Sequence, residues 1–289
     1  MSRYLDPKND LVFKKIFAEH SHLLISFLNS VLPLPEDGNI VSLEYLQKEH
    51  LPNIPEFKQT IADVKCKDAQ GRVFIVEMQM NWTDHFRQRL LFGASQAVVS
   101  QLKKGIDYRF LQPVYGLGLI TECYEKSTPE WYHHYQLSKK SSSDSNIIKE
   151  LQLVFIELPK IPIESSDEKK LRILWLRFLK EISEETNTVP AEFTAVPEIA
   201  EAVECTERAA FTQGEMDYYE AYWDVIRSEK TRIGDSYDAG LAEGKAIAAK
   251  KIAINLLKTK VSIQDIQLAT GLSEREITDL QNDLLHPSK

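Results

Sequence analysis

Three polar residues, Asp63, Glu77 and Gln79, lie in two neighbouring stretches that both have the pattern of β-strands. Residues 57–66 and 72–80 are rich in β-branched and aromatic side chains, and the segment between them has the composition of a turn with glycine near its end. The two stretches therefore predict an antiparallel hairpin. Asp63 belongs to its first strand, and Glu77 and Gln79 belong to its second.

The strand repeat of two decides which of these side chains share a face. Glu77 and Gln79 point to the same side of one strand, and Asp63 and Lys65 share a side of the other. Carboxylate oxygens are the ligands that Mg²⁺ prefers, and a metal held there can polarise a phosphoryl oxygen and activate a bound water. Such a site could hydrolyse a phosphodiester, with Asp63 and Glu77 as metal ligands and Gln79 orienting the water or the phosphate, although two acids on neighbouring strands are more often a solvated face.

A solvated pair of acids is the alternative interpretation of Asp63 and Glu77. The run 73–80 is too apolar on both faces for an exposed edge, and a carboxylate buried alone costs several kcal/mol. Glu77 therefore needs a partner. A metal would supply one, and so would Lys65.

The chain resembles the PD-(D/E)XK nuclease superfamily, and more closely its recombination-promoting nucleases, which are also described as PD-(D/E)XK nuclease family transposases. The opening segment and the triplet Glu77-Met-Gln79 are the most specific matches. The resemblance covers roughly residues 1–160 and continues more loosely into the tail. The matching stretches are 6–17, 63–65, 74–79, 87–94, 105–108 and the apolar strand 113–120.

This resemblance implies an α/β fold, with a restriction-endonuclease-like core of a mixed four-stranded sheet flanked by helices. It implies DNA cleavage that depends on Mg²⁺ or another divalent cation such as Mn²⁺. Asp63 and Glu77 would match the metal ligands, and Gln79 would match a position usually held by lysine. Glutamine is neutral, so Lys65 either supplies the missing charge or is an ordinary surface lysine.

Two further sets of charged residues bear on the site. Asp10, at the start of the first helix, is the best candidate for a third metal ligand, and it is equally an acid stabilised by the helix dipole. Arg87 and Arg89, in the helix expected over 83–104, are placed for phosphate contact, and one of them could instead pair with Glu77.

The chain of 289 residues is long enough for about two domains. We expect a nuclease-like domain over 1–160 and an acidic helical region over 161–239. The tail, 240–289, is expected to hold helices with a helix-turn-helix-like unit. Separate helices are expected over 215–232 and 245–258. The last helix of the tail begins Glu274-Arg-Glu276, which is acidic where a DNA reader would meet phosphate, so we favour a packing or dimerisation module.

Composition excludes several classes of protein. Three scattered cysteines make a disulfide framework or a zinc site improbable, and no apolar run is long enough to cross a membrane. We expect a cytoplasmic protein with DNA as its partner. A homo-oligomer is expected because cutting both strands usually takes two sites. The alternative is a catalytically inactive DNA-binding or protein-interaction protein that retains the nuclease fold.

Overall fold

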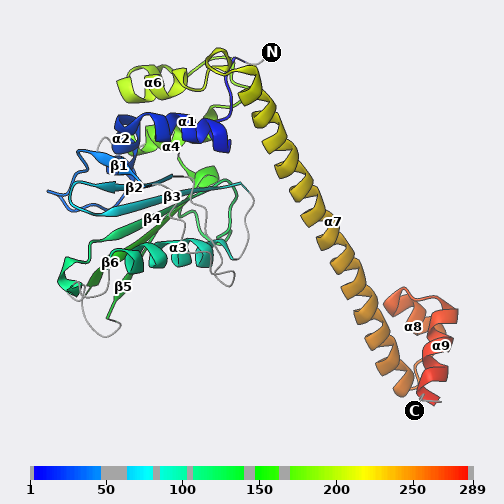
Figure 1. Ribbon diagram of the computed structural model, residues 1–289. Coiled ribbons are helices and arrows are strands. Elements are labelled where there is room, and N and C mark those ends of the chain that lie inside the picture. Colours follow the sequence, from blue (N-terminus) through cyan, green and yellow to red (C-terminus); the bar gives the residue numbers. More distant parts are fainter. Residues whose placement is uncertain are drawn as a thin grey trace. The chain divides into compact units, whose positions relative to one another are not determined.

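A mixed six-stranded sheet lies within residues 43–157 of the computed structural model, which describes residues 3–46, 64–80, 85–102, 107–139, 147–162 and 170–285 (Figure 1). The strand order is β1-β2-β3-β4-β6-β5. The central strands β3, β4 and β6 run parallel, and the outer pairings are antiparallel. The strands are β1 (Leu43–Tyr45), β2 (Val64–Asp68), β3 (Val73–Gln79), β4 (Val114–Ile120), β5 (Tyr132–Ser138) and β6 (Ile147–Glu157).

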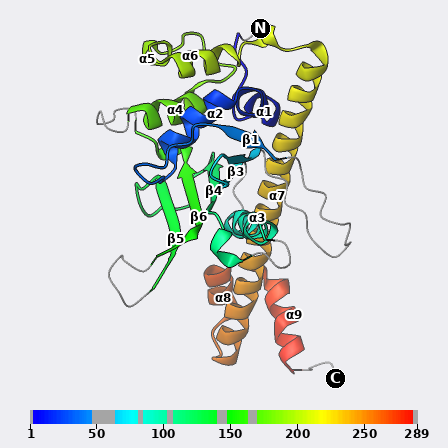
Figure 2. The ribbon, with the colours of Figure 1, turned by 60° about the vertical axis from the view of Figure 1, so that its left-hand side comes forward.

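Helices cover both faces of this sheet. Helices α1, α2 and α4 lie on one face, and α3 lies on the other (Figures 1 and 2). Every residue of β4 is therefore buried, as a central parallel strand requires. The helices are α1 (Asp10–Glu19), α2 (Ser21–Val31), α3 (Phe86–Ser100), α4 (Lys170–Glu181), α5 (Ala191–Thr194), α6 (Pro197–Glu204), α7 (Gln213–Lys258), α8 (Ile263–Thr270) and α9 (Glu274–Leu285), and short 3₁₀ turns occupy Tyr108–Phe110, Leu158–Lys160 and Arg208–Ala210.

The hairpin expected from the sequence is present as β2 and β3. Lys65 pairs with Ile75, and the turn is closed by Asp68, whose Oδ1 accepts hydrogen bonds from the backbone N–H groups of Gln70 at 3.0 Å and Arg72 at 2.9 Å. Gly71 takes a positive φ of 85°, which glycine adopts without strain. The part of the predicted first strand that precedes Val64 lies outside the described residues.

The expected mixed sheet flanked by helices is confirmed, with more strands than the four expected. Strand β5 was not expected, because five of its seven residues are exposed and its polar sequence has no apolar alternation. The two helices expected over 215–232 and 245–258 form one helix, α7, of 46 residues. Glycine inside a helix costs about 1 kcal/mol but removes no backbone hydrogen bond, so Gly234, Gly240 and Gly244 do not end it.

The chain divides into two compact units, Met1–Ile226 and Arg227–Lys289. In the second unit α8 and α9 pack on the end of α7 through Ala253, Ile266 and Ile277. Both short helices begin at a side-chain cap, because Ser262 Oγ accepts from the Asp265 N–H and Ser273 forms a reciprocal capping box with Glu276. Within the described ranges, no helix has a stretch both long and apolar enough to cross a membrane.

At Gly118 of β4 a side chain of α3 approaches the sheet closely. A Cβ atom there would lie 2.9 Å from Phe86 Cε1 and 3.0 Å from Phe155 Cδ1, and both rings are buried. We expect Gly118→Ala to lower the free energy of unfolding by about 1–3 kcal/mol, because neither ring has room to retreat. Urea unfolding measures this. Gly214→Ala is the matched control, since its Cβ would meet nothing within 4 Å, and an equal loss in both variants would contradict the expectation.

Candidate active site

Glu77 lies near the end of β3 and faces α3. Its neighbours in alternation, Val73 and Ile75, pack in the cluster under α3, whereas Phe74 and Val76 pack against the opposite helical layer. The side chain is only 4% exposed. The strand therefore carries a carboxylate into the interior, as the apolar run around it predicted.

The Glu77 carboxylate is only partly satisfied. Its Oε2 lies 3.4 Å from Arg89 Nε, while its Oε1 is buried and has no hydrogen-bond partner among the described residues. Burial raises the pKa of this carboxyl above its ordinary value, and the charge and hydrogen bond of Arg89 act in the opposite direction. An orphaned, buried carboxylate oxygen fits the requirement of a divalent cation for an oxygen ligand.

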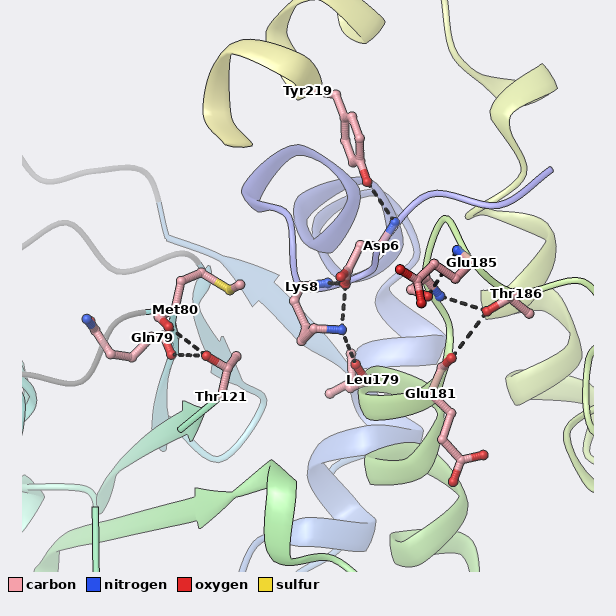
Figure 3. A network of polar contacts seen from close by, with 11 residues as sticks. Asp6, Lys8, Gln79, Met80, Thr121, Leu179, Glu181, Glu185, Thr186 and Tyr219 are labelled. Carbon is pink, nitrogen blue, oxygen red and sulfur yellow. Dashed lines mark hydrogen bonds and ion pairs between the residues drawn. The ribbon is translucent and has the colours of Figure 1, made fainter. Parts of the chain in front are cut away.

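Gln79 lies two residues beyond Glu77 on the same face, and its backbone is anchored separately. Its side-chain Oε1 accepts a hydrogen bond of 2.5 Å from Arg89 Nη2. Its carbonyl accepts from the Thr121 N–H at 3.1 Å, and Thr121 Oγ1 donates to the Met80 carbonyl at 2.7 Å (Figure 3). The residue after β4 therefore holds the end of β3 in place.

Arg89 of α3 joins the two site residues. It reaches both Glu77 and Gln79, its guanidinium lies 5.0 Å from the centre of the Phe86 ring, and 44% of its side chain is exposed. The sequence left open whether one of the two arginines pairs with Glu77. Arg89 does so, whereas the Arg87 guanidinium lies 5.6 Å from the centre of the Tyr124 ring.

Asp63 and Lys65 are the two candidate site residues on the first hairpin strand, and the structure describes only Lys65. Asp63 lies outside the described residues. Lys65 faces the α3 side and lines, with Lys67 and Ala97, a cavity of about 410 Å³ beside the last turns of α3. Neither Glu77 nor Gln79 lines this cavity. The structure thus brings Glu77 and Gln79 together through Arg89, and it places Lys65 at a cavity that neither of them lines.

Asp10 is the first residue of α1, on the helical layer opposite α3. Its carboxylate lies 2.6 Å from Lys14 Nζ and accepts a hydrogen bond of 3.3 Å from the Tyr218 hydroxyl. The charge of Asp10 is therefore neutralised within its own helix. Asp10 belongs to the helices on one face of the sheet, whereas Glu77 points toward α3 on the other face.

The segment before α1 is held to two other helices by hydrogen bonds. Lys8 Nζ lies 2.7 Å from Asp6 Oδ1 and donates to the Leu179 carbonyl at 3.1 Å, while the Asp6 N–H donates to the Tyr219 hydroxyl (Figure 3). Burial raises the pKa of Asp6, and the charge of Lys8 opposes this. These contacts join the start of the chain to α4 and to the first turns of α7.

A second buried carboxylate, which the sequence analysis did not single out, lies at the same edge of the sheet. Glu157 ends β6 in line with Ile120 and Gln79 and is completely buried. Its Oε1 lies 2.8 Å from Lys160 Nζ and 2.9 Å from His133 Nε2, and its Oε2 accepts from the Tyr124 N–H at 3.0 Å.

Glu157 and Glu77 share one signal in the sequence, a lone acid in an apolar strand. They differ in how they are satisfied, because both oxygens of Glu157 have hydrogen-bond donors, whereas Glu77 keeps one oxygen without a partner in the described part of the chain. Glu157 is therefore a structural group, and Glu77 is the candidate ligand.

No group of three or more His, Cys, Asp or Glu side chains suited to hold a metal occurs within the described ranges. Of the two acids that the sequence proposed on the hairpin, Glu77 lies within those ranges and Asp63 lies outside them.

Comparison with known proteins gives one finding. The family model described as PD-(D/E)XK nuclease family transposase matches residues 7–235, which is most of the chain and includes the hairpin, α3 and the whole sheet. No curated protein and no solved structure matches.

Proposed function

Because the chain belongs to the PD-(D/E)XK nuclease family transposases, we propose that it is a metal-dependent endonuclease that hydrolyses DNA phosphodiester bonds. Family membership itself links the chain to nucleases of mobile elements. The proposal adds DNA as the substrate, a divalent cation as the cofactor, and DNA recombination or the movement of mobile elements as the process.

The observation that carries this proposal is that Glu77 Oε1 is buried and has no hydrogen-bond partner among the residues that the structure describes. A buried carboxylate that served only stability would have donors on both oxygens, as Glu157 does. The stability of the sheet does not explain why Glu77 Oε1 is buried without a donor. Binding of a cation by this oxygen would explain it.

We propose Asp63 as the second metal ligand. In the antiparallel register that sets Lys65 opposite Ile75, each step back along β2 is a step forward along β3. The described register reaches Val64 opposite Val76. If it continued by one more residue, Asp63 would come level with Glu77. Asp10 is the third candidate, and it would first have to exchange Lys14 for the metal.

Mg²⁺, or Mn²⁺ in its place, would polarise a phosphoryl oxygen and lower the pKa of a bound water. The chain's own contribution is to hold the carboxylates on adjacent strands and to orient the water or phosphate through the Gln79 amide. Lys65 stays a candidate for the motif cation, although its side chain lines the neighbouring cavity.

One observation favours the alternative of an inactive protein that keeps the fold. Arg89 already acts as a counterion for Glu77, so the carboxylate has some compensation without a metal. Such a protein would bind DNA, or a protein partner, without any dependence on divalent cations. A homo-oligomer also stays a prediction, which rests on the need for two sites to cut both strands of DNA.

The test is to incubate the wild-type protein and Asp63→Ala with supercoiled plasmid, in Mg²⁺ and in chelator. We expect nicked or linear DNA from the wild type in Mg²⁺ alone, and none from the variant, because the metal loses a ligand. Circular dichroism must show that the variant is folded. If the wild type leaves the plasmid intact with every divalent cation tried, the inactive alternative replaces the nuclease.

A further inference from the structure

The proposed site has no positive charge at the position where lysine is usual in the resembling nucleases. Gln79 occupies that position, and an amide can only donate or accept hydrogen bonds. Phosphoryl transfer gathers negative charge on the phosphate oxygens, and a fixed cation beside them stabilises the transition state. Among the described residues, a cationic side chain of α3, that of Arg89, contacts Gln79.

That cation, Arg89, lies closer to Gln79 than to Glu77. Nη2 donates to Gln79 Oε1 at 2.5 Å, whereas Nε lies 3.4 Å from Glu77 Oε2. A structural arginine–carboxylate pair is commonly bidentate and shorter, with two parallel bonds of about 2.7–2.9 Å. The contact with Glu77 is long and single, and Glu77 Oε1 gains no donor from it.

The remainder of the Arg89 side chain is positioned for a ligand. The Phe86 ring lies 5.0 Å from the guanidinium carbon and supports the side chain, and 44% of the side chain is exposed. A guanidinium has more N–H groups than these two bonds use, and its planar fork matches two phosphate oxygens. Arg89 also fixes the Gln79 amide, because an oxygen and not an NH₂ group must face the guanidinium.

We infer that Arg89 supplies, from α3, the positive charge that Gln79 lacks, and that it binds the scissile phosphate as a catalytic residue. Arg89 is the counterion of Glu77 and the hydrogen-bond donor to Gln79. With a divalent cation held by Glu77, the long contact at Nε would no longer be needed, and Gln79 and Phe86 would keep the guanidinium in place with N–H groups left for the phosphate. This inference rests on the proposed nuclease function.

The test compares Arg89→Ala, Arg89→Lys and Arg87→Ala by plasmid cleavage and by Mn²⁺ binding without DNA, followed by electron paramagnetic resonance. We expect Arg89→Ala to lower kcat by about 10²–10³-fold, the loss found when one charge-stabilising donor is removed, and to keep Mn²⁺ binding. Added guanidinium ions should restore part of kcat. Arg89→Lys should recover part of it, because it keeps the charge without the fork.

Arg87→Ala is the matched control. It removes the same charge from the same helix, but its guanidinium lies over Tyr124. We expect it to raise KM through weaker attraction of DNA and to leave kcat unchanged.

Two results would overturn the role of Arg89 while the nuclease function stands. One is a wild-type kcat in Arg89→Ala. The other is loss of Mn²⁺ binding together with cleavage, which would make Arg89 only a support for Glu77. If the wild type itself neither binds Mn²⁺ nor cuts DNA, the proposed function fails and this inference fails with it.

Discussion

Glu77→Gln is expected to abolish Mg²⁺-dependent DNA cleavage and, at the same time, to make the protein more resistant to unfolding. The amide keeps the shape of the side chain but removes the charge that binds a metal. Loss of a metal ligand removes several kcal/mol of transition-state stabilisation, so the rate should fall by about a thousandfold or more.

The gain in stability follows from the direction of the pKa shift of Glu77. Burial raises the pKa of the folded carboxyl above its ordinary value of 4.5, and this outweighs the opposing effect of Arg89. Ionisation is therefore easier in the unfolded chain, and stability is lost as the pH rises from about 4.5 through the raised pKa. Glutamine carries no such penalty, so the variant should unfold at a higher temperature at pH 7.5.

The pH dependence is the measurement that separates this explanation from a general effect of the substitution. We expect the difference in Tm between Glu77→Gln and the wild type to shrink as the pH falls toward 4.5, where both states of the wild type take up the proton. Added Mg²⁺ should raise the Tm of the wild type and leave that of the variant unchanged. A lower Tm for Glu77→Gln at pH 7.5 would show that the carboxylate is structural.

Lys160→Met should destabilise the first unit by about 3 kcal/mol, because it leaves a completely buried carboxylate without its cation. Lys160 Nζ lies 2.8 Å from Glu157 Oε1 and also donates to the carbonyls of Glu125 and Glu130. The hydrogen bonds of Glu157 with His133 and the Tyr124 N–H remain, so we expect partial and not complete loss of folding. Urea unfolding at pH 7.5 measures the change.

Two controls make this second expectation specific. Lys126→Met, at an exposed lysine in the β4–β5 connection that also holds Glu125 and Glu130, should change the free energy of unfolding by no more than about 0.5 kcal/mol. The double variant Lys160→Met/Glu157→Gln should recover part of the loss, because the orphaned charge is gone. No recovery would mean that the lysine acts through its packing and carbonyl contacts alone.

Local features of the structure were determined by the sequence itself. The hairpin turn at Asp68–Gly71, the caps at Ser262 and Ser273, and the alternation that puts Glu77 and Gln79 on one face each depend on residues only a few positions apart. Short-range hydrogen bonds and the strand repeat decide such features, so a reader of the sequence can derive them. The apolar run around Glu77 likewise predicted a buried acid.

Only the tertiary structure decided how each acid is compensated. Glu77 meets Arg89 of α3, and Glu157 meets His133 of β5 in addition to the nearby Lys160, whereas Asp10 pairs with Lys14 within its own helix. The same sequence signal thus leads to one carboxylate with an oxygen that has no donor in the described part of the chain and to another with donors on both oxygens. The reason is that a buried charge takes its partners from whatever elements pack against its strand. Packing between distant segments depends on summed burial and not on any local pattern.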